Sequence, residues 1–178
     1  MTLEEITDLE NEWLAKHPYG RVKDLHEACE QMGIYDAWRN IFEQYVILAR
    51  EGDLEALKRA LFLYWYACSE PNELCGIPSL GDDLTFEVLG MVNNIVQKGE
   101  LDTELKWMLS YYYSLTDWYI YRFEGFDELK KISKKTDPQL FWEFCPDSSF
   151  DNRGHLGKYW KSIQKRLTID RGDMGVHL

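Results

Sequence analysis

Apolar side chains recur every three or four residues along most of this chain, the period of an α-helix with one buried face. The pattern is clearest over residues 36–50, 54–68, 84–98 and 105–123. It predicts an all-α fold in a single globular domain of roughly seven to nine helices, given ordinary helix and loop lengths. The helices are expected to pair as antiparallel αα-hairpins, which could stack as a short HEAT-like array.

Several residues mark where the first helices begin and end. Thr2 and Glu5 have the spacing of a capping box, and the helix that they start should run to about Lys16. Gly33 is placed to end a second helical segment, and Asp36 to cap the third helix. These signals predict three helices in the first fifty residues.

The helix predicted over residues 54–68 differs from its neighbours because it is apolar on two sides. Its inner stripe includes Leu57 and Leu61, while Phe62 and Tyr66 make the opposite side apolar as well. A helix of this kind is normally surrounded by other elements. We therefore expect it to lie at the centre of the domain.

A loop of about fifteen residues is expected over residues 69–83, where two prolines and two glycines oppose regular helix. Loops of this length are uncommon unless they have a function. The segment gathers four carboxylates that we take as candidate partner-binding residues: Glu70, Glu73, Asp82 and Asp83.

These carboxylates have two interpretations. They are either a solvated acidic loop or, if Leu74, Ile77 and Leu80 pack inward, an acidic rim for a cationic surface. Carboxylates mixed with Cys75 combine hard and soft ligands, which suits no single metal well. We therefore assign no metal ligand.

The rest of the chain is expected to be helical as well. Residues 114–117 could recap a new helix within the segment 105–123, and shorter helices are expected over 126–135 and 138–145. A last helix is predicted over 155–169. The domain should thus span residues 1–169, with 170–178 as a flexible C-terminal tail that has little to bury.

Two turns of the sequence match each other. Gly52-Asp53-Leu54-Glu55 aligns with Gly99-Glu100-Leu101-Asp102, and with one inserted residue 57–61 aligns with 105–109, an offset of 47 to 48 residues. Over some thirteen residues the first turn resembles the inter-helix turn of ankyrin-type repeats, without their Thr-Pro-Leu-His motif, while the period is nearer that of HEAT-type repeats. This pattern could come from an internal duplication of one αα-hairpin. It could equally come from two unrelated helix-turn-helix segments that share the same favourable turn residues by coincidence.

Composition is that of a folded protein. The 178 residues are 45% hydrophobic and 15% aromatic, well above the range of disordered chains. The start lacks the pattern of a signal peptide, and no apolar run approaches the length of a membrane span. The four cysteines show no CxxC pair. We expect a cytoplasmic protein with reduced thiols and no membrane partner.

Charge is distributed unevenly. The net charge is -11, which opposes binding to nucleic acid because phosphates are bound by cations. Residues 1–128 carry 25 acidic and 10 basic side chains, whereas residues 129–178 carry 6 and 10. The pattern predicts a basic protein partner, or a C-terminal segment that docks on the acidic body.

No catalytic motif is present. The four histidines are not paired by spacing, and no HExxH, GxSxG, phosphate-binding loop or calcium-binding loop occurs. We assign no catalytic residue and no cofactor, and lean against an enzyme. The aromatic segment offers a possible ligand pocket through Trp107, Tyr111 and Trp118, although such a stripe is more often core.

The leading hypothesis is a non-enzymatic domain that binds a basic protein through an acidic surface, in its most concrete form a bacterial toxin-immunity protein. The alternative is a small-molecule-binding protein or enzyme that uses Trp107 and Tyr111 with the loop carboxylates Glu70 and Asp82. A structural subunit with a large exposed apolar patch is a third possibility. The pattern does not predict an oligomeric state.

Overall fold

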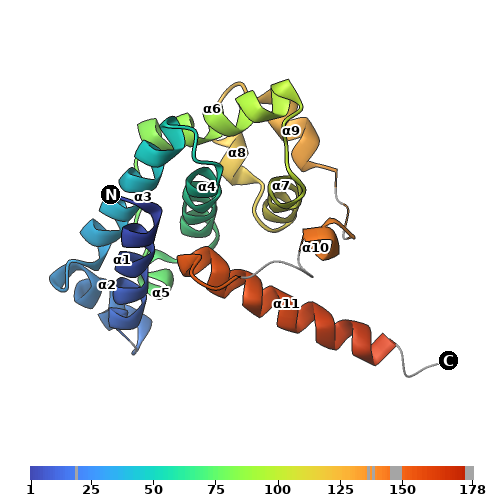
Figure 1. Cartoon of the computed structure of the whole chain (residues 1–178). Coiled ribbons are helices and arrows are strands. Elements are labelled where there is room, and N and C mark those ends of the chain that lie inside the picture. Colours follow the sequence, from blue (N-terminus) through green and yellow to red (C-terminus); the bar gives the residue numbers. More distant parts are fainter. Residues whose placement is uncertain (19, 136, 138, 145–149, 175–178) are drawn as a thin grey trace.

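The computed structural model describes residues 1–18, 20–135, 137, 139–144 and 150–174. Within these residues the chain is all-α and forms one compact domain without strands (Figure 1). Seven of its helices have ten residues or more, in agreement with the predicted number, and four are shorter. The all-α prediction is confirmed.

The helices have the following bounds: α1 Leu3–Lys16, α2 Val22–Gln31, α3 Ile34–Arg50, α4 Leu54–Ser69, α5 Asn72–Cys75, α6 Asp82–Lys98, α7 Thr103–Leu115, α8 Trp118–Tyr121, α9 Asp127–Ser133, α10 Gln139–Phe144 and α11 Gly154–Met174.

The capping box predicted at Thr2 and Glu5 is confirmed. The hydroxyl of Thr2 accepts a hydrogen bond from the amide of Glu5, and the carboxylate of Glu5 accepts one from the amide of Thr2. The predicted cap of the third helix is wrong, because α3 begins after Gly33 rather than at Asp36. Gly33 has a φ of +70°, which lets the chain turn at once and bury the first two residues of α3.

Helix α4 occupies the centre of the domain, as its two-sided apolar pattern predicts (Figure 1). It packs against α3, α5, α6, α7, α8 and α11. Every residue from 56 to 65 is buried, including Lys58 and Arg59. Two cations inside the domain need partners there, because burial of an unpaired charge is costly.

The long loop after α4 is partly ordered. It contains the single-turn helix α5, and it directs Ile77 and Leu80 inward while Leu74 stays exposed. Two of the three apolar side chains therefore anchor the loop to the core, and its carboxylates remain outside.

The predicted segment 105–123 is divided into α7 and α8, with the break near the expected residues 114–117. Helix α9 is shorter than expected, whereas α10 fills the described part of its predicted range, since residues 138 and 145 lie outside the described residues. Helix α9 packs against both α6 and α7, whereas α6 and α7 make little direct contact. The stacking of two equivalent hairpins thus stays a prediction.

The last helix is longer than expected. Helix α11 continues to Met174, five residues past the predicted end of the domain, and its C-terminal end projects beyond the body (Figure 1). Residues 175–178 of the predicted tail lie outside the described residues. No helix within the described ranges has both the length and the apolar character needed to cross a bilayer.

Candidate functional site

The two matching turns of the sequence have closely related structures at their glycines. Gly52 and Gly99 follow α3 and α6 with φ values of +97° and +72°. In both turns the amide after the glycine donates to a helix carbonyl five residues earlier, at 3.1 Å. This closure satisfies carbonyls that the end of a helix leaves free.

Each turn then starts the next helix with an aspartate cap. The carboxylate of Asp53 accepts from the amide of Ala56 at 2.9 Å, and that of Asp102 accepts from the amide of Leu105 at 2.7 Å. The capping aspartates are 49 residues apart and the glycines 47, so the second turn holds two additional residues. The sequence alignment allows only one inserted residue, so at the helix starts it pairs residues that are one position out of structural register.

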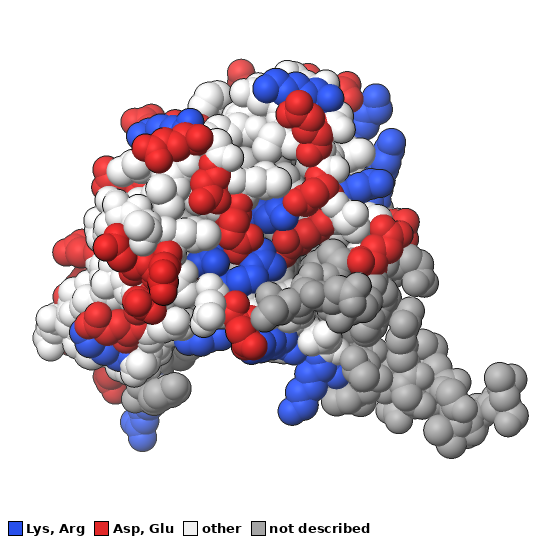
Figure 2. Space-filling view, viewed as in Figure 1, with Lys and Arg blue, Asp and Glu red and all other residues white. Residues whose placement is uncertain are grey.

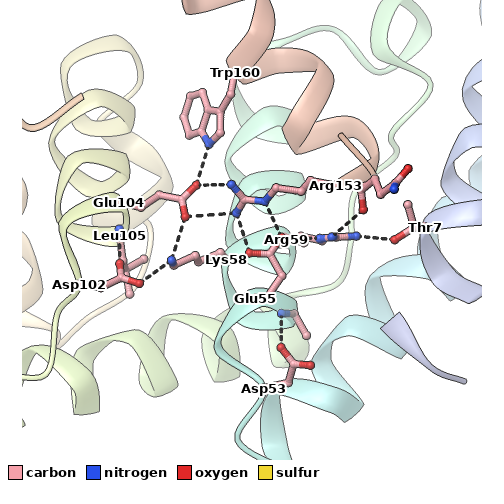
Figure 3. Close-up of polar contacts among 12 residues, drawn as sticks. Thr7, Asp53, Glu55, Lys58, Arg59, Asp102, Glu104, Leu105, Arg153 and Trp160 are labelled. Atoms are coloured by element: carbon pink, nitrogen blue, oxygen red, sulfur yellow. Dashed lines mark hydrogen bonds and ion pairs between the residues drawn. The ribbon is translucent and has the colours of Figure 1, made fainter. Parts of the chain in front are cut away.

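A buried ionic network joins the helix starts to the C-terminal part of the chain (Figure 3). Lys58 donates to Asp102 at 2.5 Å and to Glu104 at 2.9 Å. The guanidinium of Arg153 binds Glu104 at 2.7 Å and Glu55 at 2.6 Å. Glu55 and Glu104 stand two residues after their capping aspartates, so the two turns present equivalent acids to one arginine.

The centre of this network is shielded from water. The side chains of Lys58, Glu104 and Arg153 are 8%, 11% and 14% exposed, and the indole of Trp160 donates to Glu104 at 3.1 Å. Burial alone would raise the pKa of Glu104, but Arg153 and Lys58 outweigh it and lower that pKa. The C-terminal segment thus docks on the acidic body at this point, the second of the two alternatives that the charge distribution left open.

Arg59 extends the network toward α1. Its guanidinium donates to Glu55 at 2.8 Å, to the hydroxyl of Thr7 at 2.6 Å and to the carbonyl of Asn152 at 3.2 Å. It also reaches the hydroxyl of Tyr45 at 3.3 Å. Two neighbouring cations of α4 therefore hold opposite sides of the domain, Lys58 toward α7 and Arg59 toward α1.

Glu10 is a buried acid at the start of α11. Its carboxylate accepts from the amide of His155 at 3.2 Å and from the hydroxyl of Tyr45, and it lies so close to Gly154 that a side chain there would overlap with it. Burial raises the pKa of Glu10 to about 7 against these hydrogen bonds. Glu10 thus acts as a cap for α11 supplied by α1.

A groove of about 620 Å³ lies on the surface between the two turns. Its apolar lining comes from α4 and α6: Leu54, Leu57, Met91 and Ile95. Arg50 and Glu87 also line the groove and form a double ion pair with each other, with distances of 2.6 and 2.7 Å. The groove therefore combines an apolar floor with a polar border.

The border of the groove is slightly acidic. Arg50 and Glu87 neutralise each other, which leaves the carboxylates of Asp53 and Glu100 against the ammonium of Lys98. Helices α3 and α6 both end at the groove with partial negative charge, while α4 begins there with partial positive charge, which is offset by its capping carboxylate, Asp53. An apolar anchor flanked by a cation is the kind of group that this border favours.

The four loop carboxylates are divided between elements. Glu70 follows α4, Glu73 lies in α5, and Asp82 and Asp83 form the first turn of α6. Asp82 pairs with Arg122. Among the described residues no group of three His, Cys, Asp or Glu side chains is placed to hold a metal ion. The loop acids are thus four surface groups rather than one cluster.

The three aromatic candidates for a ligand pocket do not come together. Trp107 and Tyr111 stack with ring centroids 4.5 Å apart, and Trp107 also packs edge-on against Trp160. Trp118 is 47% exposed and lines a separate cavity of about 110 Å³ beside Arg122. Trp107 and Tyr111 line neither that cavity nor the groove, and contribute to packing in the core.

The described cysteines are free thiols. Burial raises the pKa of Cys29, of Cys68 to about 11 and of Cys75 to about 12. A reactive cysteine needs a lowered pKa, so these thiols have the properties of packing residues.

No family model, curated protein or solved structure matches this chain. The site has therefore to be judged from its own residues. Sequence reasoning missed the role of Arg153 and the burial of Lys58 and Arg59. The one signal that pointed to them was the match between the two turns, which contain the acids that these cations bind.

Proposed function

We propose that this chain is a non-enzymatic protein-binding domain, and that the groove between its two glycine turns holds a basic segment of a partner protein. The observation that supports this proposal is the construction of the groove. Apolar side chains of α4 and α6 form its floor, while carboxylates and two helix C-termini form its border. A partner segment with an apolar anchor next to a lysine or arginine matches both features.

The charge of the whole surface supports a basic partner as well. In the ionic network, the three cations Lys58, Arg59 and Arg153 face the three acids Glu55, Asp102 and Glu104, so the network is neutral. The net charge of -11 therefore resides on the remaining side chains. Acidic side chains are spread over the face drawn in Figure 2. Such a surface steers cationic partners toward it.

The most specific form of the proposal is a bacterial immunity role in the cytoplasm. A nuclease toxin binds phosphates through cations, and an acidic protein that covers those cations would block the toxin.

The test compares substitutions of two methionines, of which Met91 is half-buried and Met32 is exposed. Met91 lies in the groove, whereas Met32 precedes α3, about 25 Å away along that helix at 1.5 Å per residue. Met91→Arg should abolish capture of a basic protein from native lysate, and Met32→Arg should leave it unchanged. Glu100→Lys should weaken capture at low salt more than at high salt, because exposed charges are screened.

Thermal unfolding followed by circular dichroism serves as the control that each variant is folded. Equal capture of the same partners by wild type and Met91→Arg would exclude the groove as the docking site.

A further inference from the structure

Exposed apolar side chains gather on one side of this domain. Seven large hydrophobic side chains are exposed among the described residues, and four of them come from the first half of α6, the end of α7 and α8. These four, between 43% and 57% exposed, define a surface that we call the aromatic face: Phe86, Leu115, Trp118 and Tyr121. A cluster of this kind on a folded domain usually marks a site of association.

Contacts between rings join the aromatic face across the helices. Trp118 and Tyr121 stand three residues apart, so the single turn of α8 presents both on its outer side and buries the two residues between them. From α6, the ring of Phe86 packs edge-on against that of Phe123, with centroids 5.6 Å apart. Leu115 ends α7 three residues before Trp118. The face is therefore one surface, on the side of the domain away from α1 and α2 (Figure 1).

The ring of Trp118 is held beside a paired arginine. The guanidinium of Arg122 lies 6.0 Å from the centre of the Trp118 ring and 5.0 Å from that of Phe123. Arg122 also forms an ion pair with Asp82, in the first turn of α6. A ring that is already ordered loses little side-chain entropy when a partner binds. Tryptophan and arginine are also among the residues that most often anchor protein interfaces.

Two lysines of α9 and the loop after it hold the ring of Tyr121 in a similar way. The ammonium groups of Lys130 and Lys134 lie 5.4 and 5.7 Å from its centre. Lys130 also donates to a backbone carbonyl after α8 at 3.1 Å, and the hydroxyl of Tyr121 lies 3.5 Å from that of Tyr113. The aromatic face thus has a second ordered ring with cations at its border.

The charge of this region differs from that of the rest of the chain. Residues 115–135 together with Asp82 carry five cations and five acids, whereas the whole chain has a net charge of -11. The remaining residues therefore carry all of that negative charge, and two copies that met through them would repel each other. At the aromatic face this repulsion is absent, and its balanced charge favours neither a strongly basic nor a strongly acidic partner.

The balanced charges are ordered along α9. Its first turn contains Asp127 and Glu128, while Lys131 lies in its last turn and Lys134 follows it. Asp127, Lys131 and Lys134 are exposed and have the spacing of one side of a helix. Lys134 lies over Tyr121, so this side borders the aromatic face. A two-fold axis across it would place two copies of α9 antiparallel, with the acidic start of one opposite the basic end of the other.

We infer that the aromatic face is the interface of a two-fold symmetric homodimer. Trp118 and Tyr121 of the two copies pack together, and Asp127 of each copy faces Lys134 of the other. The occupant of the face is thus a second copy of this chain. The groove of the proposed function shares no residue with the aromatic face, so the two proposals stand or fall separately.

Sedimentation velocity of the full chain tests the dimer at concentrations from about 5 to about 300 μM. Wild type should change from the mass of one copy to that of two, with a dissociation constant below about 100 μM. Leu115→Glu should raise this constant at least about tenfold, because it places a charge in the apolar contact. Leu74→Glu is the matched control and should leave it unchanged, since Leu74 is 48% exposed but lies in α5, beside Trp13 of α1.

Two charge variants test the antiparallel arrangement. Lys134→Glu makes both ends of this side of α9 acidic, and Asp127→Lys makes both basic, so each variant alone should associate at least about tenfold more weakly than wild type. An equimolar mixture places an acid opposite a base at both contacts and should recover the mass of two copies. A loss of folding in either variant would not be reversed by mixing.

Three results would overturn the inference: the mass of one copy at every concentration, equal effects of Leu115→Glu and Leu74→Glu, or no association of the mixed charge variants. The same runs with a poly-glutamate peptide or with anionic lipid vesicles examine other occupants of the face. A chain that stays a single copy and binds either of them would also overturn it.

Discussion

The two glycine turns have nearly the same local structure but belong to differently packed pairs of helices. In both, a glycine closes one helix and an aspartate caps the next. Helices α3 and α4 then pack along each other, whereas α6 and α7 diverge and both contact α9. The two additional residues of the second turn accompany this difference. Short-range sequence signals thus determine a turn, while the neighbours of the helices determine how they pack.

The glutamates that follow the two turns share one partner. Glu55 and Glu104 come from helices that share few contacts, yet both bind Arg153. The C-terminal segment therefore joins the two helix pairs, a role that neither turn could have alone. Three predictions follow from this difference between the two regions, in order of decreasing effect.

The two glutamates should contribute unequally to stability. Glu104 is largely buried and binds Arg153, Lys58 and Trp160, whereas Glu55 is 27% exposed. Glu104→Gln should lower the free energy of unfolding by about 3–5 kcal/mol, because it breaks two buried ion pairs at once and leaves Lys58 and Arg153 with one acid each. Glu55→Gln should cost less, about 1–2 kcal/mol, since Arg153 keeps Glu104, while Arg59 keeps the oxygens of Thr7 and Asn152 and can donate to the amide oxygen of the new glutamine.

Urea unfolding at pH 7 measures both values, with Glu100→Gln as a control on an exposed acid of the second turn. Equal losses for the two glutamates would contradict the unequal burial of the two helix starts.

Glu10, where α1 meets the start of α11, should make the free energy of unfolding depend on pH. Its pKa in the folded state, about 7, exceeds its ordinary value of 4.5, so protonated Glu10 favours folding. This contribution is complete below pH 4.5 and is lost as pH rises through 7. The shift corresponds to about 3 kcal/mol at 1.36 kcal/mol per pKa unit.

Glu10→Gln isolates this effect, because the amide keeps an acceptor for the amide of His155 and does not titrate. The difference in unfolding free energy between wild type and Glu10→Gln should change by about 3 kcal/mol between pH 4 and pH 8, with the variant favoured at high pH. A constant difference would show that Glu10 does not change protonation in this range.

The two glycines should differ in their tolerance of asparagine. At neither glycine would a new Cβ come within 4 Å of other atoms. The backbone conformation therefore decides how much each substitution lowers the free energy of unfolding. Gly99, at φ +72°, is near the left-handed region that asparagine enters, whereas Gly52, at +97°, is farther from it. Gly99→Asn should cost about 0.5 kcal/mol and Gly52→Asn about 1–2 kcal/mol. Thermal denaturation of the two variants checks the order, and a reversed order would contradict it.

Much of the fold could be predicted from sequence because helix ends are local. The capping box at Thr2 and the glycines after α2, α3 and α6 are short-range signals, and each ends or begins a helix as expected. The start of α3 was mistaken because Asp36 has the chemistry of a cap, while burial of Ile34 and Tyr35 favours an earlier start at Gly33.

The sites were less accessible to sequence reasoning. Arg153 binds an acid 98 residues away, and no spacing indicates such a pair. The aromatic face combines α6, α7 and α8, whereas the sequence pattern placed Trp118 in a pocket with Trp107 and Tyr111. Trp107 and Tyr111 fit a pocket or a core equally well by pattern, and only their stacking and burial distinguish the two.

Site-specific photocrosslinking tests the proposed docking surface most directly. A benzophenone amino acid would be placed at Met91 in the groove and, as a control, at Met32, and irradiated in native lysate. We predict an adduct at Met91 alone, formed with a lysine- or arginine-rich peptide of a basic protein and reduced at high salt. Adducts of equal yield at both positions, or an acidic peptide at Met91, would contradict the proposed function.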